Sequence, residues 1–393
     1  MLELLKKNSA SVGKAEWQEL LIFTAELHER ALHAPFFKLP FLWEELAPEE
    51  DDYILFGHWD SVHIAYDCLE FEPEHARNQL LNILALQGDC GFIPGHVYIY
   101  DRDIHWRQKL TSPPIWAYVM QIFLEKNQED KIKERAYEAL CKQLIWFEKE
   151  RSIQEAGFYY LDILDNFCES GTEGSVRFNP IEGLARDFSC VDASSHLFLL
   201  YNMAANWGCN KLWAGKRDQL RTYIQTKLFN NDGKFFIDAW QKKVVLCFDG
   251  FWPLIVGAAT HSQAQAVIEN YLIKEDHFFT PHPLPSLSLS EEEYDSLTWR
   301  GPVRNSMTFW VAKACVRYGY PSVGKKLLER ALDQTAKHFR SEGVIWECYD
   351  PMGFSASTLK TYWMGELCSP RKNYLGHNPL IAMAILWEKL NAS

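Results

Sequence analysis

The sequence lacks the short motifs by which several large enzyme classes are recognised. It has no glycine-rich phosphate loop of the GxGxxG or GxxxxGK(S/T) type and no GxSxG nucleophile elbow. Its histidines, among them His58, His63, His96, His105 and His377, never show the HExxH-like spacing that binds a catalytic zinc ion. These absences disfavour nucleotide-dependent chemistry, serine hydrolysis and metal catalysis, and we expect the protein to use no cofactor.

Positive charge is also in short supply, because 40 Lys and Arg stand against 52 Asp and Glu, a formal net charge of -12. Nucleic acids and anionic membranes repel such a protein, so a small saccharide or glycoside is a more suitable partner. No apolar run reaches the length of a membrane span, and the first residues show no apolar signal core. We expect a cytosolic (cytoplasmic) protein, and a homo-oligomer is compatible with the sequence.

Paired cysteine motifs are missing as well, although cysteine itself is not rare. The ten cysteines are dispersed along the chain, without a CxxC pair or zinc-like Cys/His spacing. Because disulfides are rare in the cytosol, we expect buried, reduced thiols.

Aromatic residues, in contrast, are abundant: the chain has 15 Trp, 17 Tyr and 24 Phe. Many stand beside Gly, Pro and Asp in connecting segments, as in the stretch 92–106. Aromatic faces stack on sugar rings while nearby carboxylates and amides bind the hydroxyls, so this mixture suits a saccharide site. The alternative is that the aromatics only fill a large core.

Apolar residues recur at three- and four-residue spacing through most of the chain, which predicts helices, whereas clean strand alternation is scarce. Pro73 and Pro321 suit the first turn of a helix, and Asp192 suits an N-terminal cap. We therefore predict an all-α protein. The predicted helices cover residues 17–32, 73–87, 113–124, 133–150, 192–207, 211–228, 251–259, 263–273, 302–318, 322–338 and 379–390.

Long connections rich in Gly, Pro and aromatic residues separate some of these helices, at 88–112, 151–190, 274–301 and 340–378. Connections of that length inside a compact protein are usually functional. A helical toroid whose long loops gather at one end, around a central pocket, accounts for the pattern. With no repeat or linker to divide the chain, we predict one domain over 1–393, in which 1–50 forms an accessory helix that packs beside the barrel or completes it.

Four sequence fragments stand in a fixed order in this chain: FGHWDS at 56–61, ESGTEGSVRF at 169–178, WRGP at 299–302 and ECYDPMG at 347–353. Their order resembles that of the glycoside hydrolases of family 63 and their trehalase relatives, which include mannosylglycerate and glucosylglycerate hydrolases. The resemblance implies an (α/α)6 toroid with long aromatic-rich loops at one end.

Inverting hydrolysis of a glycoside needs one carboxylic acid that protonates the leaving oxygen and one carboxylate that activates water. The resemblance assigns the general acid to Glu173 and the general base to Glu347. The acid must be protonated near neutral pH, and charges on Glu169, Asp165 and Asp162 are placed to raise its pKa. The alternative role of these three residues is to hold loop backbone or, for Glu169, to bind sugar hydroxyls.

Eight further residues in these fragments are candidates for substrate binding. Trp59 and Asp60 suit a stacking ring with a hydroxyl acceptor, or else a core indole beside a helix cap. Arg300 suits a bridge between carboxylates, an anionic aglycone such as glycerate, or a structural salt bridge. The full set is Trp59, Asp60, His96, Glu169, Arg177, Trp299, Arg300 and Tyr349.

The chain departs from the family pattern at four residues in or near the fragments that carry the resemblance. Glu173 stands where the family has Asp, Thr172 replaces a larger residue, and Arg304 and His377 stand where Trp is common. We predict an inverting α-glycoside hydrolase acting on a small α-linked glucoside or mannoside, either a hexosyl-glycerate or a disaccharide. The alternatives are a carbohydrate-binding protein with weakened catalysis on the same toroid, and a sugar epimerase or isomerase that uses histidines.

Overall fold

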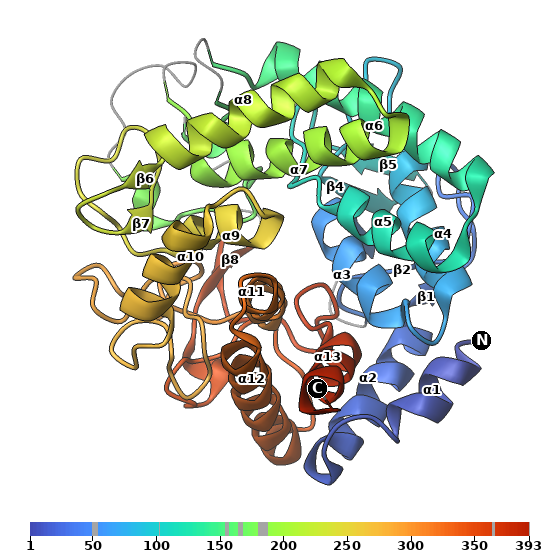
Figure 1. The fold of residues 1–393 in the computed structure, drawn as a ribbon. Coiled ribbons are helices and arrows are strands. Elements are labelled where there is room, and N and C mark those ends of the chain that lie inside the picture. Colours follow the sequence, from blue (N-terminus) through green and yellow to red (C-terminus); the bar gives the residue numbers. More distant parts are fainter. Residues whose placement is uncertain are drawn as a thin grey trace.

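The computed structural model describes residues 1–48, 54–101, 103–153, 157–163, 168–179, 188–363 and 366–392. Helices dominate these residues and form a ring of two concentric layers (Figure 1). From α3 onward the chain alternates between the layers, so that each inner helix is followed by an outer one until α13 closes the ring. The predicted all-α class is confirmed.

The inner layer consists of helices that are buried on nearly all sides. Neighbours in this layer pack on each other in chain order from α3 to α11, and α13 returns to pack on α3. Such all-round burial is typical of helices in the interior of a large protein. The inner helices are α3 (His58–Cys68), α5 (Trp116–Asn127), α7 (Val191–Gly208), α9 (Trp252–Val256), α11 (Asn305–Arg317) and α13 (Leu380–Ala392).

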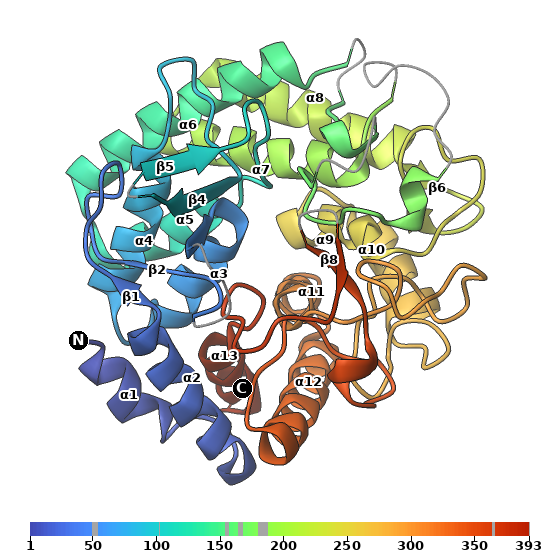
Figure 2. The ribbon, with the colours of Figure 1, turned by 180° about the vertical axis from the view of Figure 1, so that it is seen from behind.

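The outer layer consists of helices that bury one stripe and expose the other face. Figure 2 shows these helices from behind. In α12, for example, Leu327, Leu328, Ala331 and Leu332 are buried at three- and four-residue spacing. This spacing of apolar residues is the one from which the sequence predicted helices. The outer helices are α4 (Pro73–Ala85), α6 (Asp130–Glu150), α8 (Lys211–Lys227), α10 (His261–Val267) and α12 (Pro321–Glu342).

The N-terminal segment contributes α1 (Glu3–Ser9) and α2 (Gln18–Arg30). Helix α2 packs against both α12 and α13, so it stands in the outer layer beside the last inner helix (Figure 2). Of the two placements expected for residues 1–50, these contacts favour the one that completes the barrel. The assignment of 1–393 to one domain stays a prediction.

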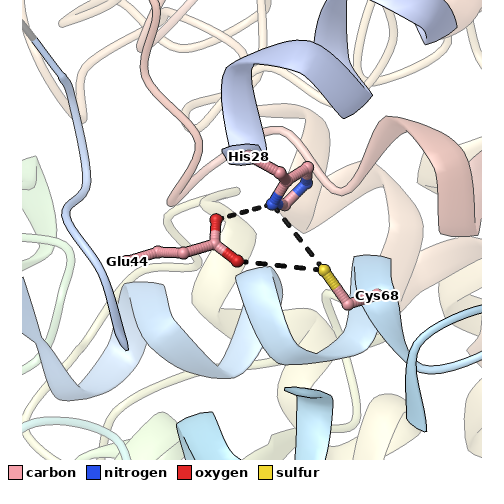
Figure 3. Close-up of side chains that lie close together, drawn as sticks. All are labelled: His28, Glu44 and Cys68. Atoms are coloured by element: carbon pink, nitrogen blue, oxygen red, sulfur yellow. Dashed lines mark hydrogen bonds and ion pairs between the residues drawn. The ribbon is translucent and has the colours of Figure 1, made fainter. Parts of the chain in front are cut away.

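A buried polar cluster fastens α2 to the ring (Figure 3). His28 of α2 places Nδ1 2.7 Å from Glu44 and Nε2 3.1 Å from Asp67 of α3. His75 of α4 lies 2.6 Å from the other oxygen of Glu44, and the Cys68 thiol is 3.7 Å from His28 Nδ1. Burial by itself would raise the pKa of Glu44, but the interactions of its carboxylate with His28 and His75 lower that pKa to about 2. The cluster therefore acts as an internal ion pair between N-terminal segment and barrel.

Short antiparallel strands line the connections. The three-stranded sheet matters most for the site, because its register pairs His96 with Gly57 and so places His96 beside the first turn of α3. This sheet consists of β3 (Ile54–Gly57), β4 (His96–Tyr100) and β5 (Asp103–Trp106). The two-stranded pairs are β1 (Leu32–His33) with β2 (Trp43–Glu44), β6 (Phe229–Asn230) with β7 (Phe235–Phe236), and β8 (Thr361–Trp363) with β9 (Glu366–Cys368).

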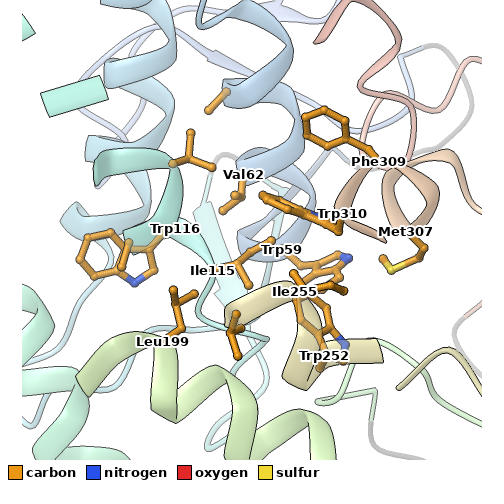
Figure 4. Close-up of a cluster of buried hydrophobic side chains, with 14 of the residues drawn as sticks. Trp59, Val62, Ile115, Trp116, Leu199, Trp252, Ile255, Met307, Phe309 and Trp310 are labelled. Atoms are coloured by element: carbon orange, nitrogen blue, oxygen red, sulfur yellow. The ribbon is translucent and has the colours of Figure 1, made fainter. Parts of the chain in front are cut away.

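Aromatic and aliphatic side chains of the inner helices fill the middle of the ring (Figure 4). Trp59 meets Trp252 edge to face with ring centroids 5.7 Å apart, and Trp310 packs nearby against Phe309. For Trp252, Trp310 and Phe309 the core-filling alternative is the one that the structure supports. None of the helices in the described residues is both long and apolar enough to cross a membrane.

Only some of the helix signals predicted from the sequence agree with the structure. Pro73 and Pro321 open α4 and α12 as predicted. The prediction for Asp192 is wrong, because α7 begins at Val191 and the Asp192 carboxylate instead pairs with Arg177. The spacing also missed α3, since a helix buried on all sides has no amphipathic stripe to reveal it.

Candidate active site

The connections that precede α3, α7, α11 and α13 meet at the end of the ring where the inner helices begin. Tyr374 donates a hydrogen bond of 2.9 Å to Asp60, and so joins the connection before α13 to the start of α3. Arg300 Nε donates to the carbonyl oxygen of Gly174 at 2.8 Å, and so joins the connections before α11 and α7. The predicted gathering of long loops at one end is confirmed.

Glu173 lies on a tight turn within this meeting point. The amide of Ser175 donates to the carbonyl of Thr172 at 3.2 Å, and Gly174 has φ +72, a conformation that favours glycine. Arg300 holds the carbonyl of Gly174 from the other side. Both flanks of Glu173 are thus fixed by backbone contacts, and Arg300 is a positioning residue for the turn.

The electrostatic surroundings of Glu173 favour its protonated form. Burial raises the pKa of its carboxyl group, and the negative charge of Glu347 acts in the same direction. Arg304 and the Trp299 side chain partly oppose this shift. A carboxyl group with a raised pKa is what a general acid requires near neutral pH.

Thr172 ties this turn to a buried ion network. Its hydroxyl group donates to Asp249 at 2.9 Å and accepts a hydrogen bond of 3.3 Å from Arg177. A larger side chain at Thr172 would lack these two contacts. The departure from the family pattern at Thr172 therefore has a structural reason.

Arg177 is the centre of that network. Its guanidinium pairs with Asp192 at 2.6 Å, with Asp238 at 2.9 Å and with Asp249 at 3.2 Å, all of them buried, and it stacks over Phe178. Burial, outweighing the attraction of Arg177, raises the pKa of Asp238 to about 7. The guanidinium of Arg177 is directed at protein carboxylates. These contacts favour a structural role for Arg177 over the role in substrate binding that was expected.

Glu169 is held in the same manner. Arg151 pairs with it at 2.8 Å, and the backbone amides of Thr111 and Leu161 donate to its carboxylate as well. Asp162 accepts hydrogen bonds from the amides of Glu169 and Ser170, both at 2.9 Å. Both acids hold loop backbone, which was the alternative role expected for them.

Burial raises the pKa of Asp162 to about 7, and the charges of Glu169 and Glu173 act in the same direction. Burial and the charge of Glu347 raise the pKa of Glu173, so the effect on Glu173 expected from Asp162 and Glu169 stays a prediction. Asp165, named with these residues in the sequence, lies outside the described residues.

Glu347 stands in a more open and loosely bonded environment. Its side chain is 12% exposed, and it accepts hydrogen bonds of 3.4 Å from Arg304 and Thr361 and of 3.3 Å from the Arg371 amide. Paired backbone bonds between Val303 and Tyr349, at 2.8 and 2.9 Å, align the segment of Glu347 with that of Arg304. A partly exposed carboxylate with weak partners remains able to accept a proton.

Arg304 interacts with both glutamates. Its guanidinium is 3.4 Å from Glu347, acts on the pKa of Glu173, and stacks over the Trp299 ring at 3.6 Å. Trp299 meets His377 edge to face at 5.9 Å. Two of the positions that depart from the family pattern, Arg304 and His377, therefore share one wall of the site.

Asp60 also faces the glutamates. Burial raises its pKa to about 7, Tyr374 partly opposes this, and the charges of Glu347 and Glu173 raise it again. Gly376 permits the close approach, because a Cβ there would lie 2.2 Å from Asp60 Oδ1. Helix α3 has Gly57 as its N-cap residue and Asp60 in its first turn, where the Asp60 carboxylate accepts a backbone hydrogen bond, so the helix-cap alternative stays a prediction.

Several buried polar atoms around this point make no hydrogen bond within the described part of the chain. They belong to both ring nitrogens of His58, the indole nitrogen of Trp59, the hydroxyl of Thr298 and Nε of Arg304. Burial lowers the pKa of His58 to about 3 and that of His96 to about 4, so both rings are neutral. Unpaired buried polar atoms are costly, and a polyhydroxylated ligand would satisfy them.

The last predicted residue, Tyr349, is a packing residue by its contacts. It is fully buried, its phenol oxygen accepts from the Trp346 amide at 3.0 Å, and its ring packs on His282 at 4.7 Å. Trp346 in turn donates to Glu342 at 2.6 Å. These contacts position Glu347 without bringing either ring to the two glutamates.

Within the described residues, two groups of side chains gather atoms that metals favour, and neither includes the two glutamates. His28, Glu44 and Cys68 form one group, and Cys190, Asp192 and Asp238 the other. In the first the atoms bond to one another (Figure 3), and in the second Arg177 already occupies both carboxylates. Neither arrangement argues for a metal in the chemistry of Glu173 and Glu347.

The sequence matches the family model of the mannosylglycerate hydrolase MGH1-like glycoside hydrolase domain over residues 56–187 and 193–358. The chain belongs to this family. Its matched residues include both Glu173 and Glu347, which supports interpreting the motif order as that of a glycoside hydrolase of this family.

Curated relatives of this family member are distant in sequence. Mannosylglycerate hydrolase MGH1 of Selaginella moellendorffii is 22% identical, over 79% of this chain and 78% of the relative. An uncharacterized protein of Borreliella burgdorferi is 23% identical over 66% of this chain, and the match spans 56% of that protein. The chain thus spans little more than half the length of the Borreliella relative.

Solved structures show the same fold. A mannosylglycerate hydrolase of Thermus thermophilus, in complex with glucose, superposes with a TM-score of 0.69 at 19% identity, covering 93% of this chain and 99% of that one. The neutral trehalase of Saccharomyces cerevisiae gives 0.64 at 17% identity, covering 86% and 72%. The predicted (α/α)6 toroid and the resemblance to family 63 and trehalases are confirmed.

Some members of the site were not among the candidates from the sequence. Arg304 was noted only as a departure, His58 only as one of several histidines, and Tyr374 not at all. The signal for Arg304 was its departure from the family pattern, because it stands where Trp is common. Tyr374 carried no such signal, since its partner Asp60 is 314 positions away.

Proposed function

We propose that this glycoside hydrolase family member is an inverting α-glycosidase that cleaves a small α-linked glucoside or mannoside, either a hexosyl-glycerate or a disaccharide. Glu173 is the general acid and Glu347 the general base. The observation that carries the proposal is the pairing of a carboxyl group of raised pKa, Glu173, with a loosely bonded and partly exposed carboxylate, Glu347.

In this mechanism Glu173 donates its proton to the glycosidic oxygen as the bond to the anomeric carbon breaks. Glu347 takes a proton from a water molecule, whose oxygen forms the new bond on the opposite face of the sugar. The leaving group departs as an alcohol, and the sugar is released with inverted configuration. Each glutamate then returns to its starting protonation state by exchange with solvent.

Substrate binding in this proposal uses buried polar side chains at the start of α3 and on β4, of which His58 and Trp59 have nitrogens without a hydrogen-bond partner among the described residues. Asp60, His58 and His96 meet the sugar hydroxyls, while Trp59 supplies an aromatic edge and an N–H donor. We assign Arg300, which holds the turn of the acid through Gly174, to the side of the leaving group, where it suits an anionic aglycone such as glycerate.

The experiment is hydrolysis of trehalose, glucosylglycerate and mannosylglycerate by the wild type and by Glu173→Gln and Glu347→Gln. Either change lowers kcat by about 10²–10⁴-fold, because each removes one proton transfer while leaving the shape of the site. Glu138→Gln, an exposed position on the outer helix α6, serves as the matched control. NMR of the first product identifies the anomer, which is β for inversion of an α-glycoside.

Retention of configuration, or full activity in either glutamine variant, contradicts the proposed mechanism. If no glycoside is hydrolysed while a sugar still raises the melting temperature, the chain is a carbohydrate-binding protein instead. The departures at Glu173 and Arg304 are what would explain that outcome.

A further inference from the structure

The guanidinium of Arg304 is buried but incompletely paired. Its exposed fraction is 1%, and its single carboxylate partner, Glu347, lies at 3.4 Å. One Nη group donates to the carbonyl oxygen of Thr298 at 3.2 Å, and Nε has no partner within the described residues. Charge-assisted hydrogen bonds of arginine normally measure about 2.7–2.9 Å, so the contact with Glu347 is loose.

The stack on Trp299 fixes the plane of this guanidinium, because the two groups are 3.6 Å apart. The titratable groups that surround it are Glu347, Glu173, His377 and Cys348. Burial lowers the pKa of His377 and raises those of Glu173 and Cys348, which favours the uncharged form of each. Among the described residues, Glu347 is the one carboxylate in ion-pair contact with the cation.

The position beside Glu347 indicates which part of a substrate Arg304 would contact. In an inverting hydrolase the base attacks through water on the face opposite the leaving group, so groups beside the base face the sugar that is cleaved. Arg300 is instead bonded to the turn of the acid. In the proposed mechanism the acid protonates the leaving oxygen, so we assign the two arginines to different ends of the glycosidic bond.

We propose that Arg304 binds a carboxylate carried by the sugar ring itself, and that the substrate class of this chain is the α-linked hexuronides. This inference rests on the proposed function for the orientation of the bond, and it replaces the neutral hexose of that proposal with a hexuronic acid. A carboxylate on the sugar ring would accept two parallel hydrogen bonds, one from Nε and one from a neighbouring Nη group. Its negative charge would also compensate the positive charge of Arg304, which burial has removed from water.

The test is binding rather than turnover, so that it does not depend on catalysis. We would titrate the wild type with D-glucuronate, D-glucose and D-glycerate by calorimetry, with thermal shift as a second readout. D-Glucuronate is expected to bind at least about tenfold more tightly than D-glucose, because hydrogen bonds to a charged group exceed those to a neutral one.

Arg304→Met should remove this preference, and Arg304→Lys should retain only part of it, since lysine keeps the charge but loses the fork. Arg340→Met, an exposed arginine on the outer helix α12, is the control that should change nothing. Thermal melts establish that the variants fold, and the comparison of ligands on the wild type needs no variant.

Equal or tighter binding of D-glucose, or no binding of either sugar, overturns the proposal. Binding of D-glycerate that depends on Arg304 also overturns it, because the arginine would then serve the leaving group. These outcomes differ from failure of the proposed function, which appears as absent hydrolysis while the binding preference for D-glucuronate persists.

Discussion

Two buried arginines of this protein, Arg177 and Arg304, lie within a few contacts of Glu173 and are bonded in opposite ways. Arg177 is paired with three aspartates at 2.6–3.2 Å. Arg304 has one carboxylate at 3.4 Å and an unpartnered Nε among the described residues. Both guanidinium groups are almost completely buried.

This contrast distinguishes an arginine that supports the structure of the site, Arg177, from one that is available to a ligand, Arg304. Arg177 bonds both Nη groups to carboxylates and has its charge overcompensated, so it holds loops in place, although its Nε, like that of Arg304, makes no hydrogen bond among the described residues. A guanidinium left with a loose partner keeps donors for a ligand. Sequence motifs alone pointed to Arg177, and the contacts point to Arg304.

The largest expected effect is on stability, from Arg177→Met. Removing this cation leaves Asp192, Asp238 and Asp249 buried beside one another, and the free energy of unfolding should fall by about 3–5 kcal/mol. Arg304→Met should cost only about 1 kcal/mol, because Glu347 is partly exposed and loosely held. Urea unfolding at pH 7 measures both. Equal losses in the two variants would contradict the contrast between the two arginines.

The second prediction concerns pH and uses Arg304→Met again. Arg304 lowers the pKa of Glu173 against the effect of burial, so its removal raises that pKa further. The acid must be protonated to act, and activity falls as pH rises through its pKa. The alkaline limb of the kcat profile should therefore move to higher pH in the variant. A shift to lower pH, or none, would show that Arg304 does not act on Glu173.

The smallest expected effect is that of Thr172→Val, which disconnects the turn of Glu173 from the Arg177 network. Asp249 loses a 2.9 Å hydrogen bond, at a cost of about 1–2 kcal/mol in unfolding free energy. Thr172→Ser keeps the hydroxyl and is the matched control. If valine and serine are equally stable in urea, the hydroxyl is not what anchors the turn.

Much of the fold could be predicted from the sequence, because outer helices such as α12 carry an apolar stripe that local spacing reveals. Inner helices were harder, and α3 escaped the spacing since it is buried on every side. The candidate site divided in the same way. The motif order located the turn of Glu173 and the segment of Glu347, and the family match supports that order.

The family, the helical class and the stretches that converge on the site can thus be obtained from the amino-acid order alone. Which charges meet is visible only in the folded chain: Glu169 with Arg151, Arg177 with its aspartates, and Arg304 with Glu347. The physical reason is that helix periodicity is a local property, whereas the partner of a buried charge is chosen by packing between segments far apart in the chain.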